Sequence, residues 1–588
     1  MGGQLNRVDV TVLPEGWTSL PSEVSGCWSA TLSPDGRHAA YVSDRGGSPK
    51  VWVQPVGSEL TFLVDTGEHP VVSVHWSTGG GWLACVLAPG GAPRTEVWLV
   101  RPDGSAPHQV AGFGADSAEN VRWLPGRPLL AVTENLTTTL LVDAEHGTRE
   151  TIATGELISL LDVTADRRRA LLRHGPRGGR YIALHDLTTG AEEHVTSGEQ
   201  ACFGPDGSVY ARSDAGELPV LIRVAGAATE VLASSNTAEV ESFALTADGT
   251  TIAVLWNVRG GESDLTVLTA DGSKQIDLPG SVVSGVSWSF DGSALAFTAE
   301  GPGQQHGVWT YDGALHPVSA EPAAPDAVYP ALHRFASHDG LEISGWLFAP
   351  AGDGPHPAVV WLHGGPEAQE RPGHGALFQS LVDRGIAVFA ANVRGSSGFG
   401  RTFVNADNGA LRYAAIADVA SCVSYLVGSG VADPDRVGCM GRSYGGYLTL
   451  AALTTYPSMF AVGIDVCGMA NFATFYEHTE PWIAAAAVSK YGDPVADADL
   501  LRDLSPITRI DRLRTPLMLV HGENDSNVPV IEAEQVVGAL AALGVPHRYL
   551  LFPGEGHELQ HRSSRARYLQ ETIGWLTAYL QPTPALLS

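Results

Sequence analysis

Short apolar runs separated by polar turns recur through the first half of the chain. The fullest copies are residues 31–36 before the apolar run 39–42, and residues 286–292 before the run 294–297. Each predicts a strand, an Asp-Gly turn and a second strand. The turn residues Asp166, Asp206, Asp248 and Asp291 follow one another at intervals of 40, 42 and 43 residues. A period of 40–45 residues with several strands is typical of propeller blades, and we expect seven; the alternative is a two-sheet sandwich.

The second half has a different pattern, in which apolar strands alternate with helical stripes. This alternation predicts a mostly parallel, doubly wound sheet of the α/β-hydrolase type. The expected strands are residues 358–362, 386–390, 437–440, 462–466, 517–520 and 548–552. Helical spacing relates Ile416, Val419, Val423 and Leu426, and likewise Leu569, Ile573, Leu576 and Leu580.

The two patterns divide the chain into three parts. Residues 25–322 are expected to form the seven-bladed β-propeller, and residues 323–588 the α/β-hydrolase catalytic domain. Residues 1–24 show no clear period. We interpret them as an N-terminal extension that packs on the catalytic domain.

Composition narrows the classes of function. The chain has 64 acidic and 36 basic residues, a formal net charge of −28, which argues against nucleic-acid binding. We find no basic leader before an apolar stretch and no run of 18 apolar residues, so neither secretion nor a membrane span is expected. Six scattered cysteines without a Cys-x-x-Cys pair indicate reduced core residues in a cytoplasmic protein, with no metal site.

One motif in the second half of the chain indicates a catalytic serine. Residues 441–447, Gly-Arg-Ser-Tyr-Gly-Gly-Tyr, follow an expected strand and precede an expected helix. A Gly-x-Ser-x-Gly motif in this setting predicts a nucleophile elbow, with Ser443 as the nucleophile. An ordinary glycine-rich loop is the alternative, because the chain contains 68 glycines.

A serine nucleophile needs a base and a carboxylate that orients it. In this architecture they follow later strands, in the order Ser, Asp or Glu, His. Asp525 and His557 stand at those places. Their local competitors are Glu523, His547 and His561.

The tetrahedral intermediate of acyl transfer also needs two hydrogen-bond donors for its oxyanion. The backbone N–H of Tyr444, directly after the nucleophile, is one candidate. The other is the N–H of Gly365, in the turn His-Gly-Gly-Pro at residues 363–366.

Together these motifs resemble the prolyl oligopeptidase family of serine peptidases, and most closely its acylaminoacyl-peptidase-like branch. The resemblance rests on the propeller and on residues 363–366, 392–396, 441–447, 525–529 and 554–557. It implies hydrolysis of short peptides in a cavity between the domains, with the propeller excluding folded proteins. It implies no metal or organic cofactor.

One position departs from the family pattern. Many members carry Arg two residues after the triad Asp, where it holds a substrate carbonyl, whereas this chain has Asn527. An amide donates one hydrogen bond but supplies no charge. The subsite preference is therefore open.

The region that builds the side-chain pocket in relatives matches residues 471–476. The expected substrate-binding residues are Phe472, Phe475, Tyr476, Asn527 and Val528. The alternative for the aromatic residues is that two of the three pack in the core. Glu477 and Glu480 are candidates to bind a free α-amine, which would make the enzyme an aminopeptidase.

The sequence thus predicts a serine peptidase that acts near the N-terminus of short peptides, as an aminopeptidase or an acylaminoacyl peptidase. Its partners are a short peptide or small amide substrate and, as a further option, a second copy of the chain. Two alternatives stay open, namely an amidase or esterase for a small acylated metabolite and an inactive peptide-binding propeller scaffold.

Overall fold

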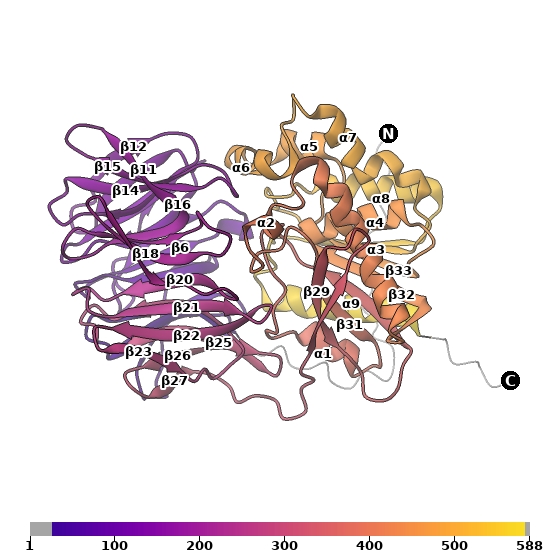
Figure 1. The fold of residues 1–588 in the computed structure, drawn as a ribbon, viewed down its shortest axis with the longest axis horizontal. Coiled ribbons are helices and arrows are strands. Elements are labelled where there is room, and N and C mark those ends of the chain that lie inside the picture. The colour runs from indigo at the N-terminus through magenta and orange to yellow at the C-terminus, as the bar shows by residue number, and fades with distance from the viewer. Residues whose placement is uncertain (1–25, 582–588) are drawn as a thin grey trace.

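The computed structural model describes residues 26–581, and the extension expected at residues 1–24 lies outside this range. A stack of antiparallel sheets forms one half of the molecule and a domain of helices around one sheet forms the other (Figure 1). The predicted fold class, a propeller followed by an α/β-hydrolase domain, is confirmed.

Strands β1 to β27 form seven blades of four strands, each an antiparallel meander in chain order. Blades 1 to 3 comprise β1 (Cys27–Leu32), β2 (His38–Ser43), β3 (Lys50–Pro55), β4 (Phe62–Val64), β5 (Val71–Trp76), β6 (Leu83–Leu87), β7 (Glu96–Val100), β8 (His108–Ala111), β9 (Ala118–Trp123), β10 (Leu129–Glu134), β11 (Thr138–Asp143) and β12 (Arg149–Thr154). Blades 4 to 7 comprise β13 (Ile158–Val163), β14 (Arg169–His174), β15 (Tyr181–Asp186), β16 (Glu192–Phe203), β17 (Val209–Ser213), β18 (Val220–Ala225), β19 (Ala228–Ala233), β20 (Glu239–Leu245), β21 (Ile252–Val258), β22 (Glu262–Thr269), β23 (Gly272–Ile276), β24 (Val282–Trp288), β25 (Leu295–Gly301), β26 (Gln304–Tyr311) and β27 (Leu315–Ser319).

Strand β16 belongs to two blades. Its first half pairs with β15 up to Ser197, and its second half pairs with β17 from Gly198 onward. Blades 4 and 5 therefore form one seven-stranded sheet. The ring closes where β1 of blade 1 contacts β24 and β25 of blade 7, and no strand pairing joins these two blades within residues 26–581.

The catalytic domain is built on one eight-stranded sheet in the order β28-β29-β31-β30-β32-β33-β34-β35. Strands β28 and β29, which the sequence pattern missed, add antiparallel to one side, and the other six run parallel. The strands are β28 (Ala331–Ala336), β29 (Glu342–Phe348), β30 (His356–Leu362), β31 (Ala387–Asn392), β32 (Ala432–Arg442), β33 (Val462–Val466), β34 (Leu517–Gly522) and β35 (His547–Phe552).

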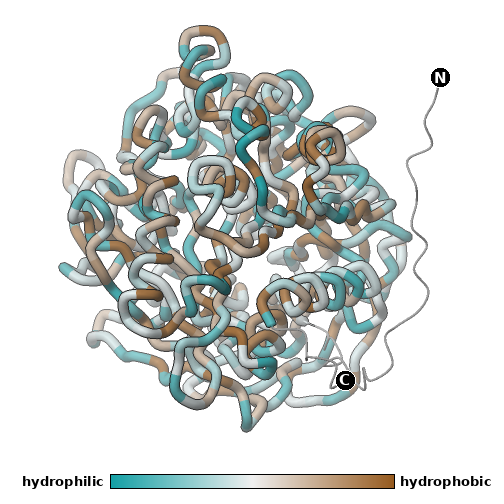
Figure 2. Tube along the Cα trace, turned by 90° about the vertical axis from the view of Figure 1, so that its right-hand side faces the viewer, coloured by the Kyte–Doolittle hydropathy of each residue, from teal (hydrophilic) through white to brown (hydrophobic). Residues whose placement is uncertain are grey.

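Helices cover both faces of this sheet. They are α1 (Ala376–Val382), α2 (Arg401–Val404), α3 (Arg412–Gly428), α4 (Tyr444–Thr455), α5 (Phe472–His478), α6 (Pro481–Tyr491), α7 (Ala498–Leu504), α8 (Ile531–Leu543) and α9 (Arg562–Leu580), with short 3-10 helices at Pro89–Gly91, Gly409–Leu411 and Pro506–Arg512. Helices α3, α4 and α8 share one apolar core with the sheet, and α1 and α9 share the other. Hydrophobic and hydrophilic stretches alternate along the chain in the view from this domain (Figure 2).

Helix α3 illustrates how the predicted stripes are used. By length and composition alone the segment Gly409–Gly428 could cross a membrane. However, its residues Ile416, Val419, Val423 and Leu426 are buried against the sheet and α4. The segment is therefore a core helix of the catalytic domain.

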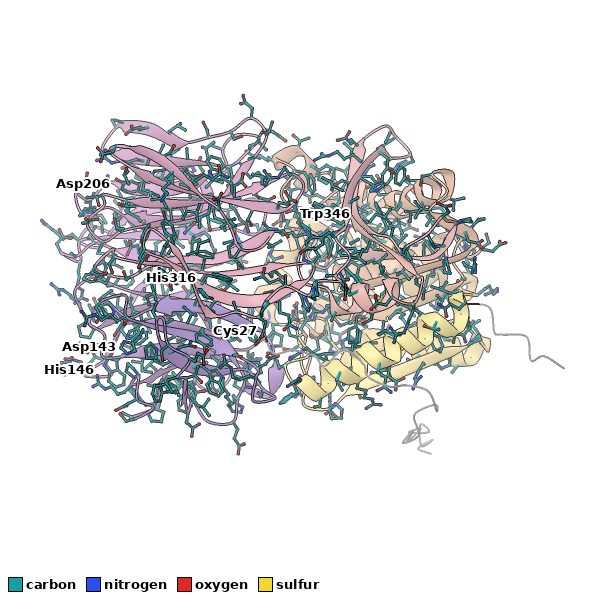
Figure 3. All side chains as sticks on the ribbon, turned by 90° about the horizontal axis from the view of Figure 1, so that it is seen from below. Cys27, Asp143, His146, Asp206, His316 and Trp346 are labelled. Carbon is teal, nitrogen blue, oxygen red and sulfur yellow. The ribbon has the colours of Figure 1, made fainter. Side chains whose placement is uncertain are left out.

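Propeller loops reach the catalytic domain from several blades. Trp346, labelled in Figure 3, donates from Nε1 to the carbonyl of Gly260 at 3.1 Å. On blade 2, the carbonyl of Gly90 accepts from Asn524 Nδ2 at 2.9 Å. A Cβ on Gly556 would lie 1.7 Å from the carbonyl oxygen of Gly91, so the two loops meet backbone to backbone. The propeller therefore covers the edge of the sheet where its parallel strands end.

Candidate active site

Ser443 lies between β32 and α4, at the N-cap of the helix, with φ 56° and ψ −118°. This conformation costs about 1–3 kcal/mol for a residue with a side chain, and such strain concentrates at functional sites. A Cβ on Gly445 would lie 1.9 Å from the carbonyl oxygen of Leu362, so only glycine fits there. The sharp turn predicted from the Gly-x-Ser-x-Gly motif is therefore present.

Two loops bring a histidine and a carboxylate to this serine. Asp525 follows β34 and His557 follows β35, at the same sheet edge. Ser443 Oγ lies 3.0 Å from His557 Nε2, and His557 Nδ1 lies 2.7 Å from Asp525 Oδ2. The structure thus unites the three predicted residues in one hydrogen-bonded chain.

The competing residues have other contacts. Glu523 is exposed. His547 Nδ1 contacts the carbonyl of Val545 at 2.8 Å, and His561 Nδ1 contacts Glu555 at 3.0 Å.

The electrostatics of the chain favour an ionised carboxylate beside a basic imidazole. Burial raises the pKa of Asp525, but the charge of His557 and its hydrogen bond outweigh burial and hold that pKa below its usual value. Burial lowers the pKa of His557, but the Cys467 sulfur and the Asp525 carboxylate raise it well above its usual value. The N–H groups of Asn527 and Val528 each donate to Asp525 Oδ1 at 2.9 Å. The carboxylate is therefore fixed toward the imidazole.

The sequence interpretation missed two neighbours of this chain. His521, at the end of β34, contacts the carbonyl of Val528 through Nε2 at 2.8 Å and lies 3.5 Å from Asp525 Oδ2. Cys467, directly after β33, places its sulfur within 4.8 Å of the ligand atoms of Asp525 and His557. His521 lies at the end of a parallel strand and Cys467 directly after one, and this position at the functional edge is the signal by which they could have been found.

The predicted oxyanion donors lie beside the nucleophile. A Cβ on Gly364 would be 3.3 Å from Ser443 Cβ, so the Gly-Gly turn runs along the elbow. Gly365 adopts φ 123°, which favours glycine. His363 Nδ1 donates to the carbonyl of Gly364 at 2.7 Å and thereby fixes the peptide that carries the Gly365 N–H. The roles of Gly365 and Tyr444 stay predictions.

A buried ion pair supports the first turn of α4. The hydroxyl of Tyr444 donates to Asp407 Oδ2 at 2.9 Å, and Arg412 Nη1 donates to the same oxygen at 2.8 Å. The Arg412 guanidinium also lies 4.7 Å from the centre of the Tyr444 ring and 4.9 Å from that of Tyr491. No sequence motif pointed to this cluster.

The predicted substrate-pocket residues lie mostly in the core. Phe472, Phe475 and Val528 are at most 2% exposed. The two phenylalanines pack on Tyr491, and Tyr476 donates from its hydroxyl to the carbonyl of Gly492 at 2.8 Å. Phe472 and Phe475 therefore offer almost no surface to a ligand in this structure, and a role in substrate binding stays a prediction.

The acidic pair considered for amine binding is arranged differently. Glu480 accepts two hydrogen bonds from Arg94 of the propeller, at 2.8 and 3.0 Å, and one from Ser526 at 2.8 Å. The Glu477 side chain is 71% exposed. The carboxylate of Glu480 is thus bound to Arg94 across the domain interface, and we do not assign it to a substrate amine.

Comparison with known proteins identifies the domain that carries this site. Residues 374–583 match the model of the prolyl oligopeptidase family. Over these residues the catalytic domain is similar to this family. The resemblance predicted from the motifs is thereby confirmed for the domain.

Curated relatives match the same part of the chain. Dipeptidyl aminopeptidase BIII of Pseudoxanthomonas mexicana is 39% identical over 233 residues, which are 39% of this chain and 34% of the relative. The acylamino-acid-releasing enzyme of Rattus norvegicus is 29% identical over 232 residues, 38% of this chain and 31% of the relative. The chain thus matches about a third of the length of these relatives.

Solved structures extend the likeness in fold to the propeller. A puromycin hydrolase superposes with a TM-score of 0.83 at 20% identity, over 95% of each chain. The acylaminoacyl peptidase of Pyrococcus horikoshii superposes with a TM-score of 0.71 at 16% identity, over 96% of this chain and 98% of the other. At these identities the likeness establishes the two-domain fold alone.

Proposed function

We propose that the protein is a serine peptidase that cleaves short peptides near their N-terminus through an acyl-enzyme on Ser443. The observation that carries this proposal is the hydrogen-bonded chain Ser443–His557–Asp525 in a domain of the prolyl oligopeptidase family. Because all three groups are in contact, the inactive-scaffold alternative is disfavoured.

The geometry supports the following sequence of steps. His557 Nε2 takes the proton of Ser443 Oγ as the oxygen bonds to the substrate carbonyl carbon, and then gives the proton to the leaving amine. Asp525 holds the Nδ1–H and stabilises the imidazolium that forms. The N–H groups of Tyr444 and Gly365 are assigned to the oxyanion. Water, deprotonated by His557, then hydrolyses the ester.

The covering of the site by the propeller supports a restriction to short substrates. Blades 1, 2, 4, 6 and 7 contact the catalytic domain, through Gly47, Gly90, Arg177, Gly260 and Glu300. The names of the relatives suggest two classes of substrate, peptides with a free amine and peptides with an acylated one. Both classes stay within the proposal, as do a cytoplasmic location and self-association of the chain.

The testing experiment is a matched panel of anilides with free, acetylated or aminoacylated amines, together with simple esters. We expect kcat/KM to be highest for one of the amide classes, and the Ser443→Ala protein to show neither turnover nor labelling by a fluorophosphonate. Ser429→Ala, which alters a serine after α3, is the matched control. Turnover by the Ser443→Ala protein would exclude Ser443 as the nucleophile.

The second candidate, an amidase or esterase for a small acylated metabolite, is favoured by Asn527. This residue lies where many family members have the arginine that holds a peptide carbonyl. If peptide hydrolysis is the function, Asn527→Arg should raise kcat/KM for longer or acylated peptides relative to aminoacyl anilides. Reaction with the esters alone would favour the metabolite hydrolase.

A further inference from the structure

Cys467 places a third donor atom beside the histidine and carboxylate of the candidate site. Its sulfur, a carboxylate oxygen of Asp525 and a ring nitrogen of His557 all lie within 4.8 Å of one another. Cys467 and Asp525 are buried, and the His557 side chain is 14% exposed. The catalytic mechanism described above uses only two of these three groups.

The backbone fixes the direction of this cysteine. The Cys467 N–H donates to the carbonyl of Val520 at 2.8 Å, so the residue continues the pairing of β33 with β34. Its φ is 44°, a left-handed conformation that residues with a side chain rarely adopt. The sulfur is thereby held at the sheet edge where the loops of Asp525 and His557 meet.

The donor set matches the preference of a thiophilic cation. Thiolate, imidazole and carboxylate are the three side-chain ligands of Zn²⁺, with Zn–S near 2.3 Å and Zn–N or Zn–O near 2.0–2.2 Å. In a tetrahedral site such ligand atoms are about 3.3–3.6 Å apart. Movements of about 1 Å by the three side chains would therefore complete the site.

The surrounding charges also permit a divalent cation. Thiolate and carboxylate together supply two negative charges. The nearby guanidinium of Arg442 is paired with Glu558 at 2.7 Å, so its repulsion of a cation is partly offset.

We propose that Cys467, Asp525 and His557 form an inhibitory binding site for a thiophilic divalent cation such as Zn²⁺ or Cd²⁺. The ion binds three protein ligands and a water, and the thiol proton is released to solvent. Either ring nitrogen of His557 serves as the ligand with the same result. Coordination at Nδ1 replaces the hydrogen bond to Asp525, and coordination at Nε2 replaces the one to Ser443. The serine then has no base.

The direct test is binding of Cd²⁺ to the full-length protein, followed by the ultraviolet thiolate-to-metal charge-transfer band. It does not depend on turnover, so it can succeed or fail independently of the peptidase proposal. We expect the band to saturate at one Cd²⁺ per chain and to be absent from the Cys467→Ser protein. The Cys27→Ser protein, altered in blade 1, is the matched control and should keep the band. Absence of the band from the unaltered protein, or its retention in Cys467→Ser, would overturn the site.

The inhibitory consequence rests on the proposed hydrolase activity and is tested separately. Zn²⁺ inhibition constants are measured for the unaltered protein, Cys467→Ser, Cys467→Ala and Cys27→Ser, each relative to its own uninhibited rate. Even loss of a group that only supports a metal ligand typically weakens metal binding about 10–100-fold. We therefore expect at least a tenfold rise in the constant for both Cys467 variants, and equal constants in all four proteins would refute inhibition through this site.

Discussion

The ion pair between Arg94 and Glu480 joins the propeller to the loop that carries Asp525. Its two ends differ in exposure, since the Arg94 side chain is 41% exposed and that of Glu480 is 6% exposed. Ser526, the neighbour of Asp525, donates to the same carboxylate at 2.8 Å. The two single substitutions should therefore have unequal effects on the stability of this region.

Arg94→Ala leaves a carboxylate buried without its cation, which costs about 3–5 kcal/mol for a fully buried pair. Because Arg94 is partly hydrated, we expect Arg94→Ala to lower the free energy of local opening by about 2–3 kcal/mol. Glu480→Gln removes the buried charge and leaves an arginine that water can reach, so we expect about 1 kcal/mol or less. The double variant should resemble Glu480→Gln.

The assay is native-state hydrogen exchange of peptides that cover residues 478–486 and 523–530, which gives the free energy of local opening. Arg37→Ala is the matched control, because its pair with Asp35 is exposed at 3.8 Å. This substitution should change the free energy of local opening of these peptides by less than about 0.5 kcal/mol. An effect of Arg94→Ala no larger than that of Glu480→Gln would refute the assignment of a buried carboxylate held by Arg94.

Three further substitutions test the site and its surroundings. Asp525→Asn should lower kcat by about 10³–10⁴-fold and move the acid limb of the pH–rate profile downward, since the carboxylate raises the pKa of His557. Burial raises the pKa of Glu370 from 4.5 to about 7, so folding favours its neutral form. The free energy of unfolding therefore falls by about 3 kcal/mol as pH rises from 4.5 to about 7. In the Glu370→Gln protein, denaturant unfolding should not show this fall with pH. Gly556→Ala would place its Cβ 1.7 Å from the Gly91 carbonyl and should abolish the closed domain contact, measured by small-angle scattering.

The sequence predicted those features that depend on local periodicity. The strands on either side of the nucleophile, the stripe of α3 and the loops of Asp525 and His557 follow from patterns of a few residues. The sequence pattern did not predict strands β28 and β29, because they lie before the alternation of strands and helices begins. The sequence pattern also did not predict that blades 4 and 5 share strand β16. The turns are regularly spaced whether or not two blades share a strand.

Contacts across the domain interface were beyond sequence reasoning. Arg94 and Glu480 are 386 residues apart, and neither lies in a motif. From its place in the chain, close to the expected substrate pocket, Glu480 is only a candidate to bind a free α-amine. The scattered cysteines, with no Cys-x-x-Cys pair, predict core residues, and the burial of Cys467 agrees with that. Its proximity to His557 depends on strand order.

The shared strand β16 has a consequence for tolerance to chain breakage. At the other joints between blades a cut in a connecting loop leaves every strand whole. A cut between Ser197 and Gly198, however, separates the outermost strand of blade 4 from the innermost strand of blade 5. Circular permutants that begin in a loop between two blades should therefore keep every strand whole, whereas a permutant that begins within β16 would divide one continuous strand between the two ends of the chain.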